Sequence, residues 1–397
     1  MAILGASGGG TKSNLPELIV ITSRTFIPPY KCKVMVHCFG GGGGGGAAYI
    51  NTESNTGIHG SGGGAGEHSC SLLTVDPAVT YTVTVGGGGS AGYVRNSQTT
   101  SNGNAGGASS FSGSDVVTTT ANGGGAGTGS RFSNGPTTAG GAGGTNGAGN
   151  LFKLTGGAGG SCVKGNSSSS SCNQHELATG GGAVNIYGNA FNGGWSVYNG
   201  ANPSAKFIAG GAGIGGYAGT ASSGNGWELS TVGGNLYGNS GSGGYNRHGY
   251  APPSFKDGHN FGFGDQISDT SSIPDMGNKT KGSIFTLIQH LVLNNATGVQ
   301  PPGIGGRGCG VGPDTGSGAQ QNVRSPASNA SLFAGGGALR SYSDGTNVSN
   351  GYGGSGGAGG GGGGGNVYRG QGTTTQWSYA GGGGKGLVVI QFIEVVS

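Results

Sequence analysis

Charged residues are scarce in this sequence, and their scarcity excludes several classes of function. Only 8% of the 397 residues are charged, and the formal net charge is +4. Lysine and arginine are spread thinly without a basic cluster, so the sequence predicts no nucleic-acid site. The 14 acidic residues stand singly, which argues against the paired carboxylates of a glycosidase. The closest approach to a cluster is Asp265, Asp269 and Asp275, which loop solubility or an incidental cation explains better than catalysis.

Long hydrophobic runs and proline are also rare. No segment reaches the ~18 apolar residues that indicate a membrane-spanning helix, so we expect no membrane insertion. The first 20 residues lack the basic start and long apolar centre of a signal peptide, so we expect synthesis and assembly in the cytoplasm. Collagen needs glycine at every third position and abundant proline. The chain has 13 prolines, and the uninterrupted glycine runs 40–46 and 359–365 break that rule.

Glycine is the residue that the chain has in excess, with 102 copies. Because glycine loses more backbone freedom on folding than any other residue, some interaction must offset that cost. A disordered linker would not need it, but such a linker has few apolar runs. This chain contains compact β-prone segments at 32–39 and 387–393. We therefore expect an ordered glycine-rich fold.

Polyglycine-II helices provide such a fold. These helices repeat every three residues and direct their amide and carbonyl groups sideways, where another glycine helix can pair with them. We therefore predict a mostly irregular or all-β fold: a bundle of polyglycine-II helices with short strands at entry and exit. Strands are expected over 31–39, 71–75, 81–85 and 386–396. The apolar spacing from Ile284 to Val292 predicts one short α-helix.

Composition divides the chain into two parts. Residues 1–25 precede the glycine tracts and form either an N-terminal attachment segment for another protein or simply the first strand of the main domain. Residues 26–397 form the glycine-rich lattice domain, in which glycine tracts alternate with loops of Ser, Thr, Asn and Tyr. Within it, residues 188–274 have few long glycine runs and many aromatic residues, so we expect the main recognition loops there.

The order of these elements resembles the glycine-rich domain of tail fibres and tail-tip adhesins of tailed bacteriophages. The matching pieces are Thr25-Phe26-Ile27-Pro28-Pro29, the strand ending Cys38-Phe39 before 40–46, Val75-Asp76-Pro77 before 81–89, Ala108-Ser109-Ser110-Phe111, 331–335 and the closing 381–390. The resemblance implies a polyglycine-II receptor-binding protein of the virion, at the tail fibre or tail tip. Its partners would be a host outer-membrane protein or surface glycan, and other tail proteins through the N-terminal segment. A homotrimer is one candidate assembly.

Aromatic residues set in Gly/Asn/Ser loops are the candidate receptor contacts, because rigid rings give large contact areas at low entropic cost. They are Trp195, Tyr198, Trp227, Tyr237, Tyr245, Tyr250, Phe261, Trp377 and Tyr379. The alternative is that some of them only cap the lattice ends. At the level of function, the alternative to host-receptor binding is a structural tail or baseplate component without receptor contact.

No residue pattern indicates an enzyme, a cofactor or a metal. Six cysteines lack CxxC spacing, and the seven histidines form no close pair in the sequence. Cys32 and Cys38 share a strand face with Val34 and Val36, which predicts buried thiols. A disulfide between Cys162 and Cys172, which bracket a serine-rich loop, is one interpretation, and two thiols are the other. Lys385 precedes Gly386 rather than Ser or Thr, which argues against a phosphate loop.

Overall fold

The protein was analysed as a computed structural model, which describes about half of the chain. The longer described ranges are 17–20, 22–50, 57–95, 100–132, 139–161, 338–343, 351–369 and 377–396. Shorter ones are 177–179, 181–182, 184, 192–193, 195–197, 207–209, 220–221, 233–235, 238–240, 333 and 335–336. Six of the candidate aromatic residues (Tyr198, Trp227, Tyr237, Tyr245, Tyr250 and Phe261) lie outside these ranges, as do Cys162, Cys172 and the expected helix at 284–292.

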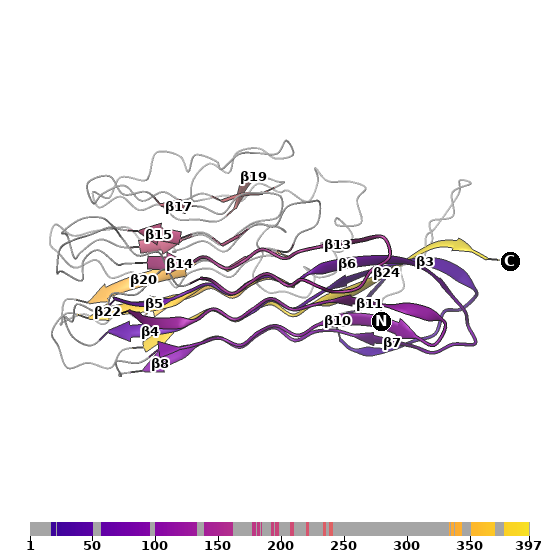
Figure 1. The fold of residues 1–397 in the computed structure, drawn as a ribbon, viewed down its shortest axis with the longest axis horizontal. Coiled ribbons are helices and arrows are strands. Elements are labelled where there is room, and N and C mark those ends of the chain that lie inside the picture. Colours follow the sequence, from indigo (N-terminus) through magenta and orange to yellow (C-terminus); the bar gives the residue numbers. More distant parts are fainter. Residues whose placement is uncertain are drawn as a thin grey trace, which may run out of the picture.

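Two sheets form a β-sandwich at one end of the elongated molecule (Figure 1). The first sheet has the order β1 (Glu17–Val20), β24 (Leu387–Val395), β3 (Cys32–Phe39), β6 (His68–Val75) and β13 (Phe152–Leu154). The second has the order β11 (Val116–Ala121), β10 (Ser109–Gly113), β7 (Tyr81–Thr84) and β2 (Arg24–Phe26). The first and last described strands, β1 and β24, are antiparallel neighbours, so both ends of the described chain belong to this sandwich.

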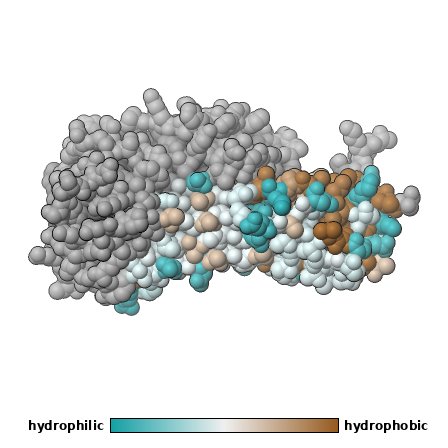
Figure 2. Space-filling view, in the orientation of Figure 1, coloured by the Kyte–Doolittle hydropathy of each residue, from teal (hydrophilic) through white to brown (hydrophobic). Residues whose placement is uncertain are grey.

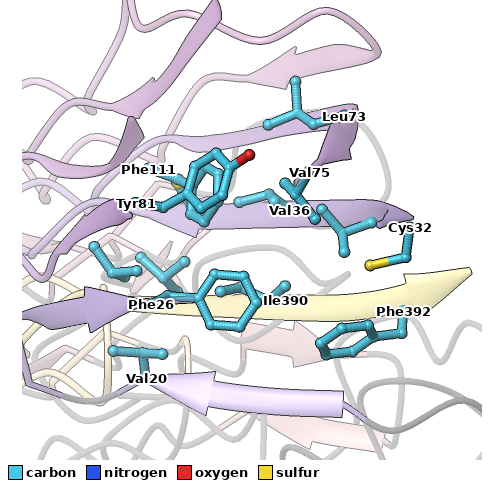
Figure 3. Packing of buried hydrophobic residues seen from close by; sticks show 14 of the residues in the cluster. Val20, Phe26, Cys32, Val36, Leu73, Val75, Tyr81, Phe111, Ile390 and Phe392 are labelled. Atoms are coloured by element: carbon cyan, nitrogen blue, oxygen red, sulfur yellow. The ribbon is translucent and has the colours of Figure 1, made fainter. Parts of the chain in front are cut away.

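A side-chain core fills the sandwich (Figure 3). In β3 the alternate residues Cys32, Val34, Val36 and Cys38 are fully buried, as the period-two pattern of the sequence predicts. The core also contains four aromatic side chains that pack edge to face or stacked. They are Phe26, Tyr81, Phe111 and Phe392. The Tyr81 hydroxyl accepts from the Asp76 amide and donates to the Asp115 carboxylate, so its polar group is satisfied at the edge of the core.

Smaller sheets lie at the opposite end, which we call the distal end (Figure 1). One has the order β16 (Phe207–Ala209), β20 (Ala338–Ser343), β22 (Gly365–Arg369), β4 (Ala47–Ile50) and β9 (Thr100–Ser101). A two-stranded sheet pairs β12 (Gly129–Phe132) with β5 (Gly57–Gly60). A three-stranded sheet has the order β14 (Leu177–Thr179), β15 (Trp195–Val197) and β17 (Thr220–Ala221). Another has the order β21 (Gly351–Tyr352), β23 (Trp377–Tyr379) and β8 (Tyr93–Arg95). A separate hairpin joins β18 (Gly233–Asn235) to β19 (Gly238–Ser240).

Glycine tracts join the two ends. The chain leaves the sandwich through β3, crosses along 40–46 to β4, returns along 61–67 from β5 to β6, and then repeats such crossings. The tracts run side by side along the long axis in Figure 1. They are neither helices nor strands by their own hydrogen bonding, so their backbone groups must pair sideways.

The hydrogen bonds of tract 40–46 rotate among its neighbours with a period of three residues. Its amides donate in turn to three tracts, at 2.8 to 2.9 Å. Gly40, Gly43 and Gly46 donate to tract 61–67, at Glu67, Gly64 and Ser61 respectively. Gly41 and Gly44 donate to tract 102–107, at Gly107 and Asn104, and Gly42 and Gly45 donate to tract 381–384, at Gly384 and Gly381. Its carbonyls accept in turn from three further tracts. Gly41 and Gly44 accept from Gly124 and Gly127, and Gly42 and Gly45 accept from Gly89 and Gly92. Gly43 and Gly46 accept from Gly362 and Gly365. Six neighbours therefore surround this tract, three on its donor sides and three on its acceptor sides.

The two uninterrupted glycine runs are fully enclosed. All residues of 40–46 and of 359–365 are buried. A Cβ built on any residue of 40–46 would overlap a neighbouring backbone, for example the Gly125 carbonyl in the case of Gly43. Tract 61–67 is also buried throughout but includes Ala65, so burial alone does not exclude a methyl group. The space around each Cβ decides whether the glycine tracts can accommodate one.

The described part of the chain confirms the all-β or irregular fold class, because it contains strands and unclassified backbone but no helix. The strands predicted at 31–39, 71–75, 81–85 and 386–396 are confirmed as β3, β6, β7 and β24. Of residues 1–25, those at 17–20 form β1, and β2 begins at Arg24. The distal strands were not predicted, because they are short and border glycine tracts, so few residues carry a strand pattern.

We predict that a glycine tract tolerates an added methyl group only where the new Cβ would overlap no neighbouring backbone atom. Gly43→Ala and Gly362→Ala should each lower the free energy of unfolding by about 2–4 kcal/mol, through overpacking and lost hydrogen bonds. In both cases the new Cβ would overlap a carbonyl oxygen, that of Gly125 or Gly381. Chemical denaturation of each variant measures the change.

The matched controls are Gly87→Ala and Gly382→Ala. A Cβ on Gly87 would meet no atom within 4 Å, and one on Gly382 would lie 3.6 Å from the Gly89 oxygen, an ordinary contact. These variants should be neutral or more stable by up to about 1 kcal/mol, because alanine restricts the unfolded chain. Equal losses in both pairs of variants would contradict close lateral packing as the constraint.

Candidate functional site

Three of the nine aromatic candidates lie on described strands of the distal end. Trp195 begins β15, where its backbone pairs with Thr179 and Thr220. Trp377 and Tyr379 lie on β23, and their side chains are half-buried. The other six candidates fall outside the described residues, so the structure brings together only one pair of the predicted set.

Strand β8 completes a site around that pair. In the antiparallel register, Trp377 lies opposite Arg95 and Tyr379 lies opposite Tyr93. The Tyr93 and Tyr379 rings stack at a centroid distance of 4.4 Å, and the Arg95 guanidinium carbon lies 4.7 Å from the centre of the Trp377 ring. We call these four residues the aromatic–arginine face.

The lattice sets the register of this face. Tract 86–92 leads directly into β8, and β23 leads directly into tract 381–386. The Ala380 amide donates to the Gly92 carbonyl at 3.0 Å, which places the next pair, Tyr93 and Tyr379, opposite each other. On the reverse of the two strands, Val94 and Ser378 are buried. Alternation along each strand therefore directs the four larger side chains away from the lattice interior.

The sequence analysis did not single out Tyr93 and Arg95. The available signal was the symmetry of two short segments, Tyr-Val-Arg just after a glycine tract and Trp-Ser-Tyr just before one. Each has the large–small–large alternation of a strand with one open face. The partner of each segment depends on which tracts lie side by side, and that information is not local.

A second cluster of reactive residue types lies where the sandwich meets the lattice. The Nδ1 atom of His37 and the Nε2 atom of His68 are 3.0 Å apart in a hydrogen bond, and the Cys70 sulfur lies 3.9 Å from the His37 Nε2 atom. The two histidines are far apart in the sequence, and strand pairing brings them together. His37 pairs with Cys70 and Phe39 pairs with His68, so the two histidines lie on the same face of the sheet, two residues apart along the register.

Burial makes this histidine–cysteine cluster chemically inert. Burial raises the pKa of the Cys70 thiol to about 12 and lowers the pKa of His37 to about 4, so the neutral forms dominate at pH 7. A nucleophilic cysteine needs the opposite shift, toward the thiolate. The rings around the cluster are tightly packed: Phe39 stacks on His68 at 4.1 Å and on Phe333 at 4.5 Å. We assign the cluster to packing rather than to catalysis.

The remaining polar groups of the described residues suggest no metal centre. Among them, no group of three or more His, Cys, Asp or Glu side chains is arranged to hold a metal ion. Cys32, Cys38 and Cys70 are buried free thiols, as predicted for the first two. The search of the described part for helices also finds none that is long and apolar enough to cross a membrane.

Comparison with known families agrees with the glycine tracts. The family described as a glycine-rich domain matches residues 20–266, which is more than half of the chain. The chain belongs to the glycine-rich domain family. No curated protein matches it.

The match to the glycine-rich domain begins within β1 and covers the tracts that surround 40–46 from one side. Residues after 266 add tracts 353–365 and 381–386 and the strand β24. In this glycine-rich domain those later residues are integral, because β24 lies between β1 and β3 in the sandwich. The aromatic–arginine face likewise combines β8, inside the match, with β23, beyond it.

The buried His37 predicts a specific pH dependence of stability. Its pKa is about 4 in the folded protein and about 6.5 in an unfolded chain, so the unfolded chain takes up a proton first as the pH falls. The contribution of His37 is fully present above pH 6.5 and is lost as the pH falls to 4. We expect a loss of about 3 kcal/mol over this window, measured by urea unfolding at a series of pH values.

The control for this prediction is His37→Gln, which removes the titrating group. Its absolute stability is expected to be lower at pH 8, so the comparison uses the slope of stability against pH. The variant should show a clearly shallower slope between pH 6.5 and pH 4. An unchanged slope would assign the acid sensitivity to other groups.

Proposed function

We propose that this glycine-rich domain is a non-enzymatic adhesin of a tailed-phage virion, located at the tail fibre or tail tip. Its sandwich end attaches to other tail proteins, and its distal end contacts the host cell surface. The observation that carries the proposal is the aromatic–arginine face, which lies on the distal sheets at the far end of the glycine tracts from the sandwich. Rings and an arginine on a fixed support are typical of binding surfaces.

The proposal includes polyglycine-II geometry for the tracts. A helix of this type repeats every three residues and pairs only with its neighbours. The rotation of donors and acceptors of tract 40–46 among six neighbours, returning to each after three residues, supports this assignment. A tract of seven residues would span about 22 Å at ~3.1 Å per residue. That length separates the two ends of the molecule.

Such a lattice would make the distal end a rigid support. The distal strands β4, β5, β8, β9, β12, β22 and β23 each continue a tract that is hydrogen-bonded to other tracts, so these strand ends are held in place before any ligand arrives. Preorganisation lowers the entropic cost of binding. The connections that leave these strands, 51–56, 96–99, 133–138 and 370–376, are rich in Asn, Ser, Thr and Gln, the composition of adaptable contact loops.

The sandwich end carries features of an attachment surface. Six aliphatic side chains in or beside the sandwich are exposed: Leu72 at 38%, Ile393 at 39%, Leu151 at 48%, Ile27 and Val395 at 59% each, and Val117 at 76%. Figure 2 shows that strongly apolar surface gathers at this end, while the visible tract surface is pale. Apolar patches with polar surroundings mark protein contacts. The same patch supports the second candidate function, a structural tail component that contacts only other virion proteins.

Whole-cell binding tests the proposal. Labelled full-length protein should bind cells of a susceptible bacterial strain and block adsorption of the phage, and Trp377→Ala should weaken cell binding about tenfold or more, as for an interface hot spot. Val117→Ser at the sandwich end is the matched control and should leave cell binding unchanged.

The structural alternative predicts the reverse outcome. In that case Val117→Ser would reduce incorporation of the protein into particles, while the purified protein would neither bind cells nor compete with phage. Trp377→Ala would then leave adsorption unchanged. Release of glycan fragments from cells by the purified protein would contradict the non-enzymatic assignment.

A further inference from the structure

Charge is distributed unevenly between the two ends of the described molecule. Every described Asp and Glu lies in the sandwich or at its junction with the lattice: Glu17, Glu67, Asp76, Asp115 and Glu394. The described lysines lie there too: Lys31, Lys33, Lys153 and Lys385. The distal strands carry only arginine: Arg95 on β8, Arg131 on β12, Arg340 on β20 and Arg369 on β22. All charged residues on the described distal strands are therefore arginines, so these strands carry only positive charge.

The contacts of Arg95 indicate how such an arginine could bind a ligand. Its guanidinium carbon lies over the Trp377 ring, 4.7 Å from the ring centroid, in a cation–π contact. Within the described residues Arg95 makes no ion pair and donates no hydrogen bond, whereas Lys31 and Lys33 are paired with Asp76 and Glu394. A cation–π contact uses the charge of the guanidinium and leaves its N–H groups available for another acceptor.

From these two observations we infer that the distal end binds an acidic carbohydrate, one that carries carboxylate or phosphate groups. This rests on the proposed function and specifies its ligand class. The guanidinium fork matches a carboxylate or a phosphate through two parallel N–H···O bonds, and lysine offers no such fork.

The apolar contacts of the face favour a carbohydrate over a protein. A protein interface normally has a core of apolar side chains, but the large exposed aliphatic side chains of the described residues belong to the sandwich end and its junction. Beside Arg95 the distal face offers aromatic rings instead, Tyr93 and Tyr379 in addition to Trp377. The negative faces of such rings attract the polarised C–H groups on the flat side of a sugar ring.

Binding of defined polymers to the full-length protein tests the inference. The probes are polygalacturonate for carboxylate, a phosphorylated mannan for phosphate, neutral dextran, and a DNA duplex as a generic polyanion. At least one acidic polysaccharide should bind, dextran should not, and binding should weaken with added salt. Arg95→Gln should reduce the affinity about tenfold or more, as expected for loss of a charge-assisted hydrogen bond.

Two further variants separate charge, fork geometry and folding. Arg95→Lys keeps the charge without the fork and should recover only part of the affinity. Arg24→Gln, which removes an exposed arginine on β2 in the sandwich, should bind like the parent protein. Equal losses for Arg24→Gln and Arg95→Gln, equal binding of dextran, or stronger binding of DNA than of either acidic polysaccharide would overturn the inference. Thermal melting confirms that the variants are folded.

The same variants distinguish failure of the inference from failure of the proposed function. Cell binding that survives in Arg95→Gln, with no affinity for acidic polysaccharides, would leave the adhesin proposal standing and remove its acidic ligand. Binding to acidic polysaccharides without any binding to bacterial cells would do the opposite.

Discussion

Hydrogen bonds between parallel and antiparallel glycine tracts are the interaction on which the rest of this molecule depends. In tract 40–46, every amide donates to a neighbouring tract, and no side chain intervenes. The backbone is thereby satisfied without a helix or a sheet, which is the condition for burying it. Glycine is required because a Cβ at these positions would overlap a neighbouring carbonyl. The entropic cost of ordering so much glycine is offset by hydrogen bonding and close packing rather than by apolar burial.

The lattice also explains how the two ends differ. At the sandwich end, tracts pass into long strands whose side chains form an apolar core around Tyr81 and Phe111. At the distal end they pass into strands of two to six residues, where the described residues form a small core cluster of Ala47, Val94 and Ala380. This difference between the two ends supports the proposal that the contact surface lies at the distal end.

The junction between the sandwich and the glycine tracts contains backbone conformations with positive φ. Phe333 has a positive φ of 63°, and the nearby Gly359 has a φ of 72°. Their backbones bond into the lattice while the Phe333 ring stacks on Phe39, which in turn stacks on His68. Backbone conformations that L-residues rarely adopt are retained here because the surrounding contacts determine them. The junction joins a side-chain core to a backbone core.

The sequence by itself determined the fold class and the entry and exit strands. These properties are local: alternation in β3 reports burial, and an unbroken run such as 40–46 reports that no Cβ can be accommodated. Only the tertiary structure decided which segments meet. Glycine tracts lack side chains that would distinguish one partner from another, so nothing local pairs tract 86–92 with 381–386. Because Tyr93 and Arg95 reach Tyr379 and Trp377 only through that pairing, the aromatic–arginine face became visible only in three dimensions.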